Sequence, residues 1–459
     1  MIRKLLLIAT LFVVAFLSVQ AQDSIKYSHK QVADDIRFFM SNAAEIHPNL
    51  YHDISRQALT DKTDSLIKIL PDTLTPVMAY RAFLQTTAFI NEGHTSMNTP
   101  QVVRAQLKSG RVKYIPIQVN DYRDAHFEAT GIATASNLGD VKISAINGQS
   151  AKDIFNQMMQ LKGGLASFKK VIAVKSFPLF LAAIGVHGPY TVEYTGKGRG
   201  KKVALLNGIS QAEYIAAMKG AINPEPYTFT VLNKKYGYLN FRSMRNGAQF
   251  EKFADSVFKT IDEQKINKLV IDLRENSGGD SGLGDYLLGY VTETPYRMAG
   301  GSQLKVSQQF KTFMKTPGLN YSKPDAYFTM ANGTSMNFGG NDLRKPDDRK
   351  YKFKGKVCFL IGSFTFSSAN MLASTVKDYK LATLVGEPVG EPANDYGELC
   401  TINLPNTGFS GFTSTTLWIR PNGNTRDSKP VAPDYLVKAN SGAGDKVLEY
   451  ALEWLDGRK

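Results

Sequence analysis

The sequence KVCFLIGSFTFSSANMLASTVKD, which runs from Lys356 to Asp378, carries the strongest structural signal in this chain. Its first part, Lys356 to Ile361, has the length and the β-branched and aromatic content of a buried strand. From Ala369 to Val376 the apolar residues recur three and four positions apart, which is typical of one face of a helix. The sequence therefore predicts a strand followed by a helix, with Ser367 and Ser368 at the helix start.

The position of this serine pair suits a nucleophile. A hydroxyl at a helix start lies beside backbone N–H groups without intrahelical partners, and beside the positive end of the helix dipole. An oxyanion needs both features. Serine is also a preferred N-cap residue, so a capping role for Ser367 is the alternative, and only partners elsewhere in the chain can decide between the two.

A second strand and turn occur about a hundred residues earlier. The strand is predicted at Lys268 to Arg274, followed by Glu275-Asn276-Ser277-Gly278-Gly279 and an apolar helix from Leu283 to Val291. Adjacent glycines let a backbone N–H point toward a bound anion with no side chain in the way. An ordinary turn between a strand and a helix is the alternative interpretation.

Together these units resemble peptidase family S41, which includes the C-terminal processing proteases and the tricorn core proteases. The matching motifs are D-L-R-x-N-x-G-G, then T-x-S-S-A, then A-T-L-V-G-E-P at Ala382 to Pro388. Asn91 to Thr95 resembles the D-G-H-T segment of the histidine-containing branch, and Val431 to Asp434 resembles the terminal G-V-x-P-D. The resemblance implies an α/β fold with a ClpP/crotonase-like catalytic core.

The resemblance also implies roles for single residues. Ser367 corresponds to the nucleophile, and Ser368 would supply one oxyanion N–H. Gly278 is expected to supply the other, with Gly279 as the second choice. In the processing proteases a lysine after the G-E-P segment is the base, but Glu391 stands in that region here. A carboxylate cannot imitate a neutral amine, so we reject a Ser/Lys dyad.

The tricorn-like branch uses a histidine base and a carboxylate before the terminal P-D. His94 resembles the first, and Asp427 stands where the family has glutamate as the second. A neutral imidazole can take the serine proton, and a carboxylate fixes its tautomer. Gly93 replaces the serine that precedes the family's histidine, so a fourth network member is unassigned. The candidates are Ser96, Glu92, Glu391 and Glu398.

The N-terminus resembles a secretory leader. Arg3 and Lys4 precede an apolar run from Leu5 to Val19, and small residues precede Gln22. This pattern predicts a Sec-type signal peptide cleaved after Ala21, hence an exported protein in the periplasm or outside the cell. The run is too short for a membrane span, and no lipidation cysteine follows it.

The chain carries a net positive charge, but its basic residues do not form a nucleic-acid-binding pattern. The formal charge of +14 becomes 14 − 2 = +12 without the leader. Its densest basic stretch, Gly196 to Lys202, is interpreted as a solvated hairpin, and nothing indicates a nucleic-acid partner.

The histidines lack metal-ligand spacing, so we expect no metal or cofactor. The strands that hold Cys358 and Cys400 are expected to be neighbours in one sheet, with pairing left open.

The length of the mature chain suits two or three domains rather than one. Residues 139–148 resemble the G-D-x-I-x-x-I-N-G turn of a PDZ-like module, although its usual carboxylate-binding loop is absent. The long stretch at 296–355 is expected to form a wall or lid over the cleft between Gly278 and Ser367. The expected parts are the signal peptide at 1–21, a helical region at 22–104, a PDZ-like β-rich module at 105–225 and the catalytic domain at 226–459.

The sequence therefore predicts a secreted serine-type peptidase acting on peptides or proteins. An esterase on the same core is one alternative, since one constellation serves both acyl transfers. A peptide-binding member that has lost catalysis is another, because of the missing lysine and of Gly93. The sequence does not predict an oligomeric state.

Overall fold

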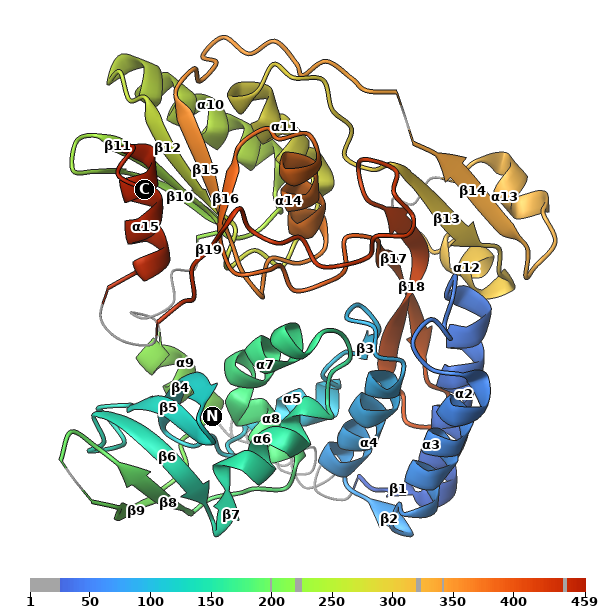
Figure 1. Cartoon of the computed structure of the whole chain (residues 1–459). Coiled ribbons are helices and arrows are strands. Elements are labelled where there is room, and N and C mark those ends of the chain that lie inside the picture. Colours follow the sequence, from blue (N-terminus) through green and yellow to red (C-terminus); the bar gives the residue numbers. More distant parts are fainter. Residues whose placement is uncertain (1–24, 199, 219–224, 319–322, 341, 441–443) are drawn as a thin grey trace, which may run out of the picture.

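The computed structural model describes residues 25–198, 200–218, 225–318, 323–340, 342–440 and 444–459. The leader expected at residues 1–21, with its cleavage site after Ala21, lies outside these residues. Within the described ranges, none of the helices is long and apolar enough to cross a bilayer. The chain folds as a mixed α/β structure with several sheets and many helices (Figure 1).

The first sheet has six strands, all of which lie between residues 227 and 436. Neighbouring strands pair in parallel, except that the first two pair antiparallel. The strand order is β10 (Tyr227–Leu232), β11 (Tyr236–Phe241), β12 (Lys268–Asp272), β15 (Lys356–Ile361), β16 (Thr383–Gly386) and β19 (Tyr435–Leu436). The strands expected at 268–274 and 356–361 are therefore confirmed, and they are direct neighbours.

Helices cover both faces of this sheet (Figure 1). Leu269 and Phe359 pack on one face in a cluster with α10 (Gly247–Glu263), α11 (Ser281–Val291) and α14 (Ser368–Asp378). Val270 and Leu360 point to the other face, against α15 (Lys446–Leu455). Burial on both faces explains why these strands read as continuous apolar runs. It also brings the turns that follow β12 and β15 to the same edge of the sheet.

A second, antiparallel sheet extends from this core. Its strands run in the order β14 (Ser335–Gly339), β13 (Gly301–Lys305), β18 (Ser410–Ile419) and β17 (Asp395–Asn403), with β3 (Ser96–Met97) beside β18. The expectation for the cysteines was wrong: Cys358 lies in β15 and Cys400 in β17, so they belong to different sheets and both are free. The residues around Cys400 predict a strand, but they do not indicate that this strand, β17, belongs to a different sheet from β15.

The hairpin of β17 and β18 reaches the N-terminal helices (Figure 1). These are α2 (His29–Ile46), α3 (Arg56–Lys68), α4 (Pro76–Phe89) and α5 (Gln101–Lys108). The first three confirm the helices that apolar residues three and four positions apart predict at 31–40, 56–70 and 76–90. Ser28, Ser55 and Thr75 cap the first three helices. Asp35 on α2 accepts hydrogen bonds from the backbone N–H groups of Asn406 and Thr407, which ties down the tip of the hairpin.

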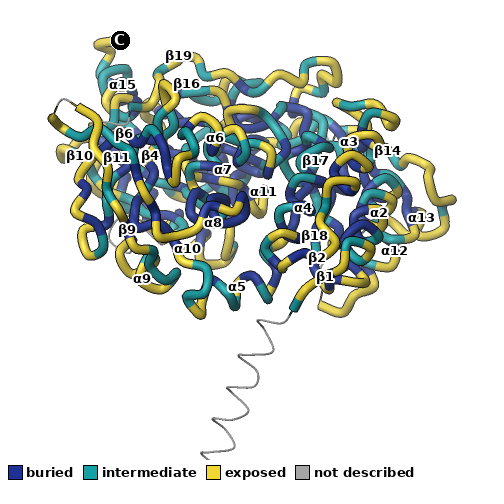
Figure 2. The backbone as a smooth tube through the Cα atoms, turned by 90° about the horizontal axis from the view of Figure 1, so that it is seen from below, coloured by how far each residue is buried: buried dark blue, intermediate teal, exposed yellow. Residues whose placement is uncertain are grey.

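A third sheet lies in the middle of the chain. Its strands are β4 (Ile117–Arg123), β5 (His126–Gly131), β6 (Asp140–Ile146), β8 (Tyr190–Thr195) and β9 (Lys202–Leu206), with β7 (Gln149–Ser150) beside β6. The pairing of β8 with β9 confirms the basic hairpin. The helices here are α6 (Ala151–Met159), α7 (Ala166–Lys175), α8 (Phe177–Ala183) and α9 (Gln211–Met218). Figure 2 shows that α8 belongs to the buried interior.

The stretch at 296–355 has more regular structure than its sequence indicated. Besides β13 and β14, it contains α12 (Gln308–Phe313) and α13 (Asp325–Thr329). Tyr327 of α13 is fully buried against Phe310 of α12. These elements form the outer end of the second sheet (Figure 1).

Candidate active site

Ser367 lies in the turn between β15 and α14, with a strained backbone. It occupies the N-cap position with φ 55° and ψ −129°, and its side chain makes no capping hydrogen bond. A positive φ is unfavourable for a residue with a Cβ and costs about 1–3 kcal/mol. The capping alternative therefore finds no support, because the hydroxyl is not used for a cap. Strain of this kind is concentrated at functional positions.

Neighbouring turns hold Ser367 in this conformation. Its backbone N–H donates to the Glu391 carboxylate. The N–H of Phe366 donates to the Asn276 carbonyl at 3.1 Å, and the Thr365 hydroxyl donates to the Leu273 carbonyl at 2.9 Å. The serine loop is thus tied to the turn after β12 and to the loop after β16.

The glycine turn after β12 touches the serine directly. A Cβ on Gly278 would lie 2.7 Å from the Cβ of Ser367 and 2.8 Å from the nitrogen of Ser368, so this close approach requires glycine. The N–H of Gly278 donates to the Asn276 side-chain oxygen at 2.8 Å. Gly278 was the first choice as an oxyanion donor, but its N–H already has an acceptor.

Two other backbone N–H groups remain near the serine. Among the contacts of the described residues, the N–H groups of Gly279 and Ser368 have no acceptor. Ser368 begins α14, where an N–H has no carbonyl one turn before it. The Ser368 hydroxyl donates to the Gly279 carbonyl at 2.5 Å, which joins the two turns. This pair fits an oxyanion better than Gly278 does.

His94 reaches this site from the N-terminal part of the chain. It lies just before β3, which pairs with β18 through Met97 and Gly411. The imidazole packs against the Phe366 ring, with centroids 4.5 Å apart. Its side chain is 10 % exposed, and both ring nitrogens are buried without a hydrogen-bond partner among the described residues. The structure thus brings His94 beside the residue that precedes Ser367.

Two carboxylates face the same nitrogen of His94. The distance from Nδ1 is 3.4 Å to Glu92 Oε1 and 3.6 Å to Glu391 Oε2. Glu391 also accepts the Ser367 N–H, so its side chain lies between the serine and the histidine. Both glutamates were among the four residues that the sequence analysis gave as candidates for the fourth member of the catalytic network.

Glu92 is the better placed to carry a negative charge. Its carboxylate accepts from the Thr95 N–H at 2.7 Å, the Thr95 hydroxyl at 2.6 Å and the Ser414 hydroxyl at 3.2 Å, besides the His94 N–H. Burial is the largest influence and would raise its pKa. The bonds and charges of His94, His47 and Thr95 outweigh burial, so the pKa of Glu92 lies well below its usual range.

Glu391 has the opposite tendency. Burial, followed by the charge of Asp395, raises the pKa of Glu391 well above its usual range. Burial also raises the pKa of Asp395, and the two carboxyl groups are hydrogen-bonded to each other. Two adjacent buried carboxylates cannot both ionise cheaply, so this pair retains a proton when Glu92 is already charged.

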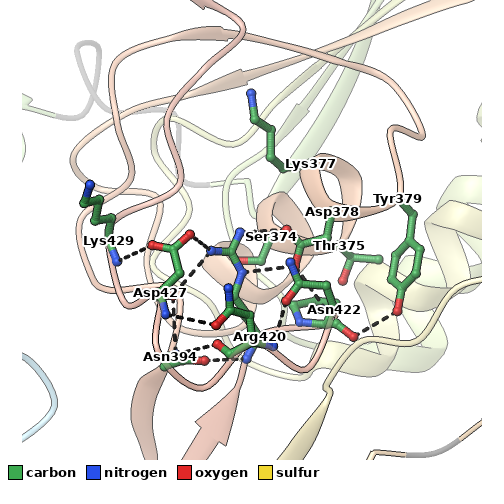
Figure 3. Close-up of polar contacts among 12 residues, drawn as sticks. Ser374, Thr375, Lys377, Asp378, Tyr379, Asn394, Arg420, Asn422, Asp427 and Lys429 are labelled. Carbon is green, nitrogen blue, oxygen red and sulfur yellow. Dashed lines mark hydrogen bonds and ion pairs between the residues drawn. The ribbon is translucent and has the colours of Figure 1, made fainter.

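Asp427 lies elsewhere, in a different polar cluster (Figure 3). Its carboxylate pairs with Arg420 Nη1 at 2.6 Å, and Arg420 Nη2 pairs with Asp378 at 2.6 Å. No contact joins Asp427 to His94 among the interactions of the described residues. The structure therefore differs from the expectation that Asp427 orients the base, because Arg420 at the end of β18 binds its carboxylate. Glu398 pairs with Lys323 in a similar way.

A cleft of about 910 Å³ opens beside these groups. Ser302 of β13 and Phe338 of β14 form part of its wall, together with Phe366. The stretch at 296–355 thus supplies a wall of this cleft, whose described lining includes Phe366 and Glu391 but neither Gly278 nor Ser367. Four carboxylates also line it, and none of the described lining residues is lysine or arginine. The carboxylates are Asp53, Glu92, Glu391 and Asp395.

The variant Asp427→Asn is expected to retain turnover within about threefold of the wild type. The reason is that its carboxylate is bound to Arg420 and is 44 % exposed. Arg420 also keeps its second carboxylate partner, Asp378, in this variant. Steady-state kinetics on a peptide substrate measure the effect. A fall of about ten thousandfold, as for loss of an orienting aspartate, would restore Asp427 to the machinery.

Comparison with known proteins points to one family and one fold. Residues 235–437 match the model for peptidase family S41. The chain is similar to the crystal structure of mature CPAF, with 14 % identity and a TM-score of 0.61 over 93 % of this chain and 96 % of that one. It is also similar to a putative peptidase from Parabacteroides merdae, with 14 % identity and a TM-score of 0.50 over 94 % and 97 %. These likenesses are of fold. Ser367 and the glycine turn lie inside the matched segment, and His94 lies outside it.

Proposed function

Because this chain belongs to peptidase family S41, we propose that it is a serine-type peptidase with Ser367 as nucleophile, His94 as base and Glu92 as the residue that orients the base. The observation that carries the proposal is that Ser367 and His94 both contact the carboxylate of Glu391. Glu391 accepts the Ser367 N–H and lies 3.6 Å from His94 Nδ1, although the serine and the histidine are far apart in sequence.

The proposed reaction uses these groups in turn. The Ser367 hydroxyl attacks the peptide carbonyl, its proton passes to His94, and a C–O bond forms. The N–H groups of Ser368 and Gly279 stabilise the negative oxygen. His94 then gives the proton to the leaving amine as the C–N bond breaks. Water, deprotonated by the same imidazole, hydrolyses the acyl-enzyme and restores the serine.

Glu92 takes the role first given to Asp427. It approaches Nδ1 of His94, and its low pKa keeps it ionised, so it stabilises the imidazolium that forms when the serine proton moves. Glu391, whose pKa is raised by burial and by the charge of Asp395, instead holds the Ser367 backbone in place. The acidic lining of the cleft favours peptides that carry cationic groups over acidic ones.

The remaining parts of the chain fit an exported enzyme with an auxiliary module. We infer a leader at 1–21 from the sequence pattern, followed by a helical region at 22–104. The strand β6, the turn at Asn147 and Gly148, and α6 support a PDZ-like module at 105–225. The parallel sheet with helices on both faces supports a ClpP/crotonase-like core at 226–459.

Labelling with a fluorophosphonate tests the serine mechanism. We expect one equivalent of label on Ser367, because an activated serine hydroxyl attacks the phosphorus. Mass spectrometry of the labelled protein locates the site. Ser368→Ala is expected to be labelled, since only its backbone N–H is needed, and Ser367→Ala is not. A folded wild-type protein without label would support a peptide-binding protein instead, whereas a labelled protein that cleaves esters but no peptide would support an esterase.

A further inference from the structure

The segment between α6 and α7 lies against the loop that carries His94. Lys162 Nζ donates to the Gly93 carbonyl at 2.6 Å. The N–H of Gly164 donates to the side-chain oxygen of Asn91 at 3.3 Å. This segment belongs to the middle of the chain, outside residues 235–437, so the family match assigns it no role.

The backbone of Gly163 and Gly164 packs directly against the backbone of Glu92 and Gly93. A Cβ on Gly163 would lie 2.7 Å from the Glu92 carbonyl oxygen and 2.9 Å from its nitrogen. A Cβ on Gly164 would lie 3.2 Å from the Cα of Gly93, and its φ of +102° also favours glycine. The two glycines therefore allow Lys162 to reach the loop between Glu92 and His94.

Phe168 extends the same contact to the serine. Its ring stacks on Phe366, with centroids 4.2 Å apart and planes 7° apart. A methyl group added to Gly93 would lie 3.6 Å from this ring, and one added to Gly390 would lie 3.2 Å from it. One aromatic side chain thus stacks on Phe366, beside Ser367, and lies near the loops that carry His94 and Glu391.

The ammonium of Lys162 lies among the ionisable groups of the site. Burial lowers the pKa of Lys162 to about 8, and the charge of Glu92 opposes this shift. The side chain is therefore mostly charged at pH 7, and its bond to the Gly93 carbonyl is charge-assisted. Glu92 and His94 lie on the loop that it binds, and Glu391 follows Gly390 beyond the Phe168 ring.

We propose that Lys162 is a positioning residue for catalysis, whose ammonium holds the Gly93 carbonyl so that the next residue, His94, faces Ser367. This inference rests on the proposed function, because it takes His94 as the base. It assigns part of the active-site architecture to the middle module. Lys162 binds a backbone carbonyl of the loop that carries His94, so its effect is expected on the orientation of the base and not on substrate binding.

The first test removes the charge at nearly constant length. Lys162→Met is expected to lower kcat and the rate of fluorophosphonate labelling about ten- to hundredfold, the range for loss of one charged hydrogen bond. KM should stay within about twofold. Lys162→Arg, which keeps a charged donor, should recover most of the rate. Lys152→Met on α6, an exposed lysine of the same module, is the matched control and should be unchanged.

A second test leaves the lysine in place. Gly163→Ala adds a methyl group against the Glu92 backbone and should lower kcat with little change in KM. Gly139→Ala is its control, because no atom lies within 4 Å of the added methyl group. If Lys162→Met does not fold, wild-type kcat in Gly163→Ala would still overturn the positioning role, because the methyl group presses this segment away from the loop that Lys162 binds.

The outcomes separate this inference from the proposed function. Wild-type kcat and labelling rate in folded Lys162→Met, or in Gly163→Ala, would overturn the positioning role. A loss that appears only in KM would also overturn it. Absence of label on the wild-type protein would instead refute the serine mechanism, before any lysine variant is measured.

Discussion

Ser367→Ala and His94→Ala are each expected to abolish nearly all turnover, by about 10⁴- to 10⁶-fold in kcat. The serine supplies the attacking oxygen, and without the imidazole its proton has no acceptor. The two residues act as a unit, so the double variant should cost little more than either single one. Steady-state kinetics of the three variants on one peptide substrate measure this non-additivity.

Two controls accompany this prediction. His126→Ala removes a histidine of β5 whose ring nitrogen contacts only the backbone carbonyl of Asp124 among the described contacts, and turnover should not change. Ser368→Ala loses the hydroxyl bond to the Gly279 carbonyl but keeps the backbone N–H, so a loss of about tenfold is expected. Wild-type turnover in His94→Ala, or a larger loss in Ser368→Ala than in Ser367→Ala, would place the machinery on other residues.

The second large effect is expected for Glu92→Gln. The amide cannot stabilise the imidazolium, and kcat should fall by about 10²- to 10⁴-fold. Both carboxylate oxygens accept hydrogen bonds, so the new NH₂ group must face a donor such as the Thr95 or His94 N–H. Stability should therefore also fall, by about 1–3 kcal/mol for a buried group without a partner. Kinetics and urea unfolding measure the two losses separately.

Glu391→Gln is the matched comparison for Glu92→Gln. Both side chains face His94 Nδ1, but the pKa of Glu391 is raised and that of Glu92 is lowered. A protonated Glu391 resembles glutamine, so its replacement should cost less than about tenfold in kcat. The reverse order of the two losses would identify Glu391 as the charged partner of the histidine.

The sequence by itself determined the local units that carry the chemistry. The strand and helix around Ser367, the strand and glycine turn before α11, and the three N-terminal helices all lie where their patterns predicted them. These units depend on short-range features, namely apolar spacing, glycine at turns and capping residues. The motif around Ser367 therefore indicated the family before any contact was known.

Only the tertiary structure decided which groups meet. The direction of a carboxylate depends on the nearest cation or donor in space, so Arg420 binds Asp427 while Thr95 and Ser414 hold Glu92 beside His94. The same reason removes Gly278 as an oxyanion donor, because the Asn276 side chain accepts its N–H. Sequence spacing carries no information on such competition. It arises when the hairpin of β17 and β18 and the segment at 160–168 bring distant loops together around Ser367.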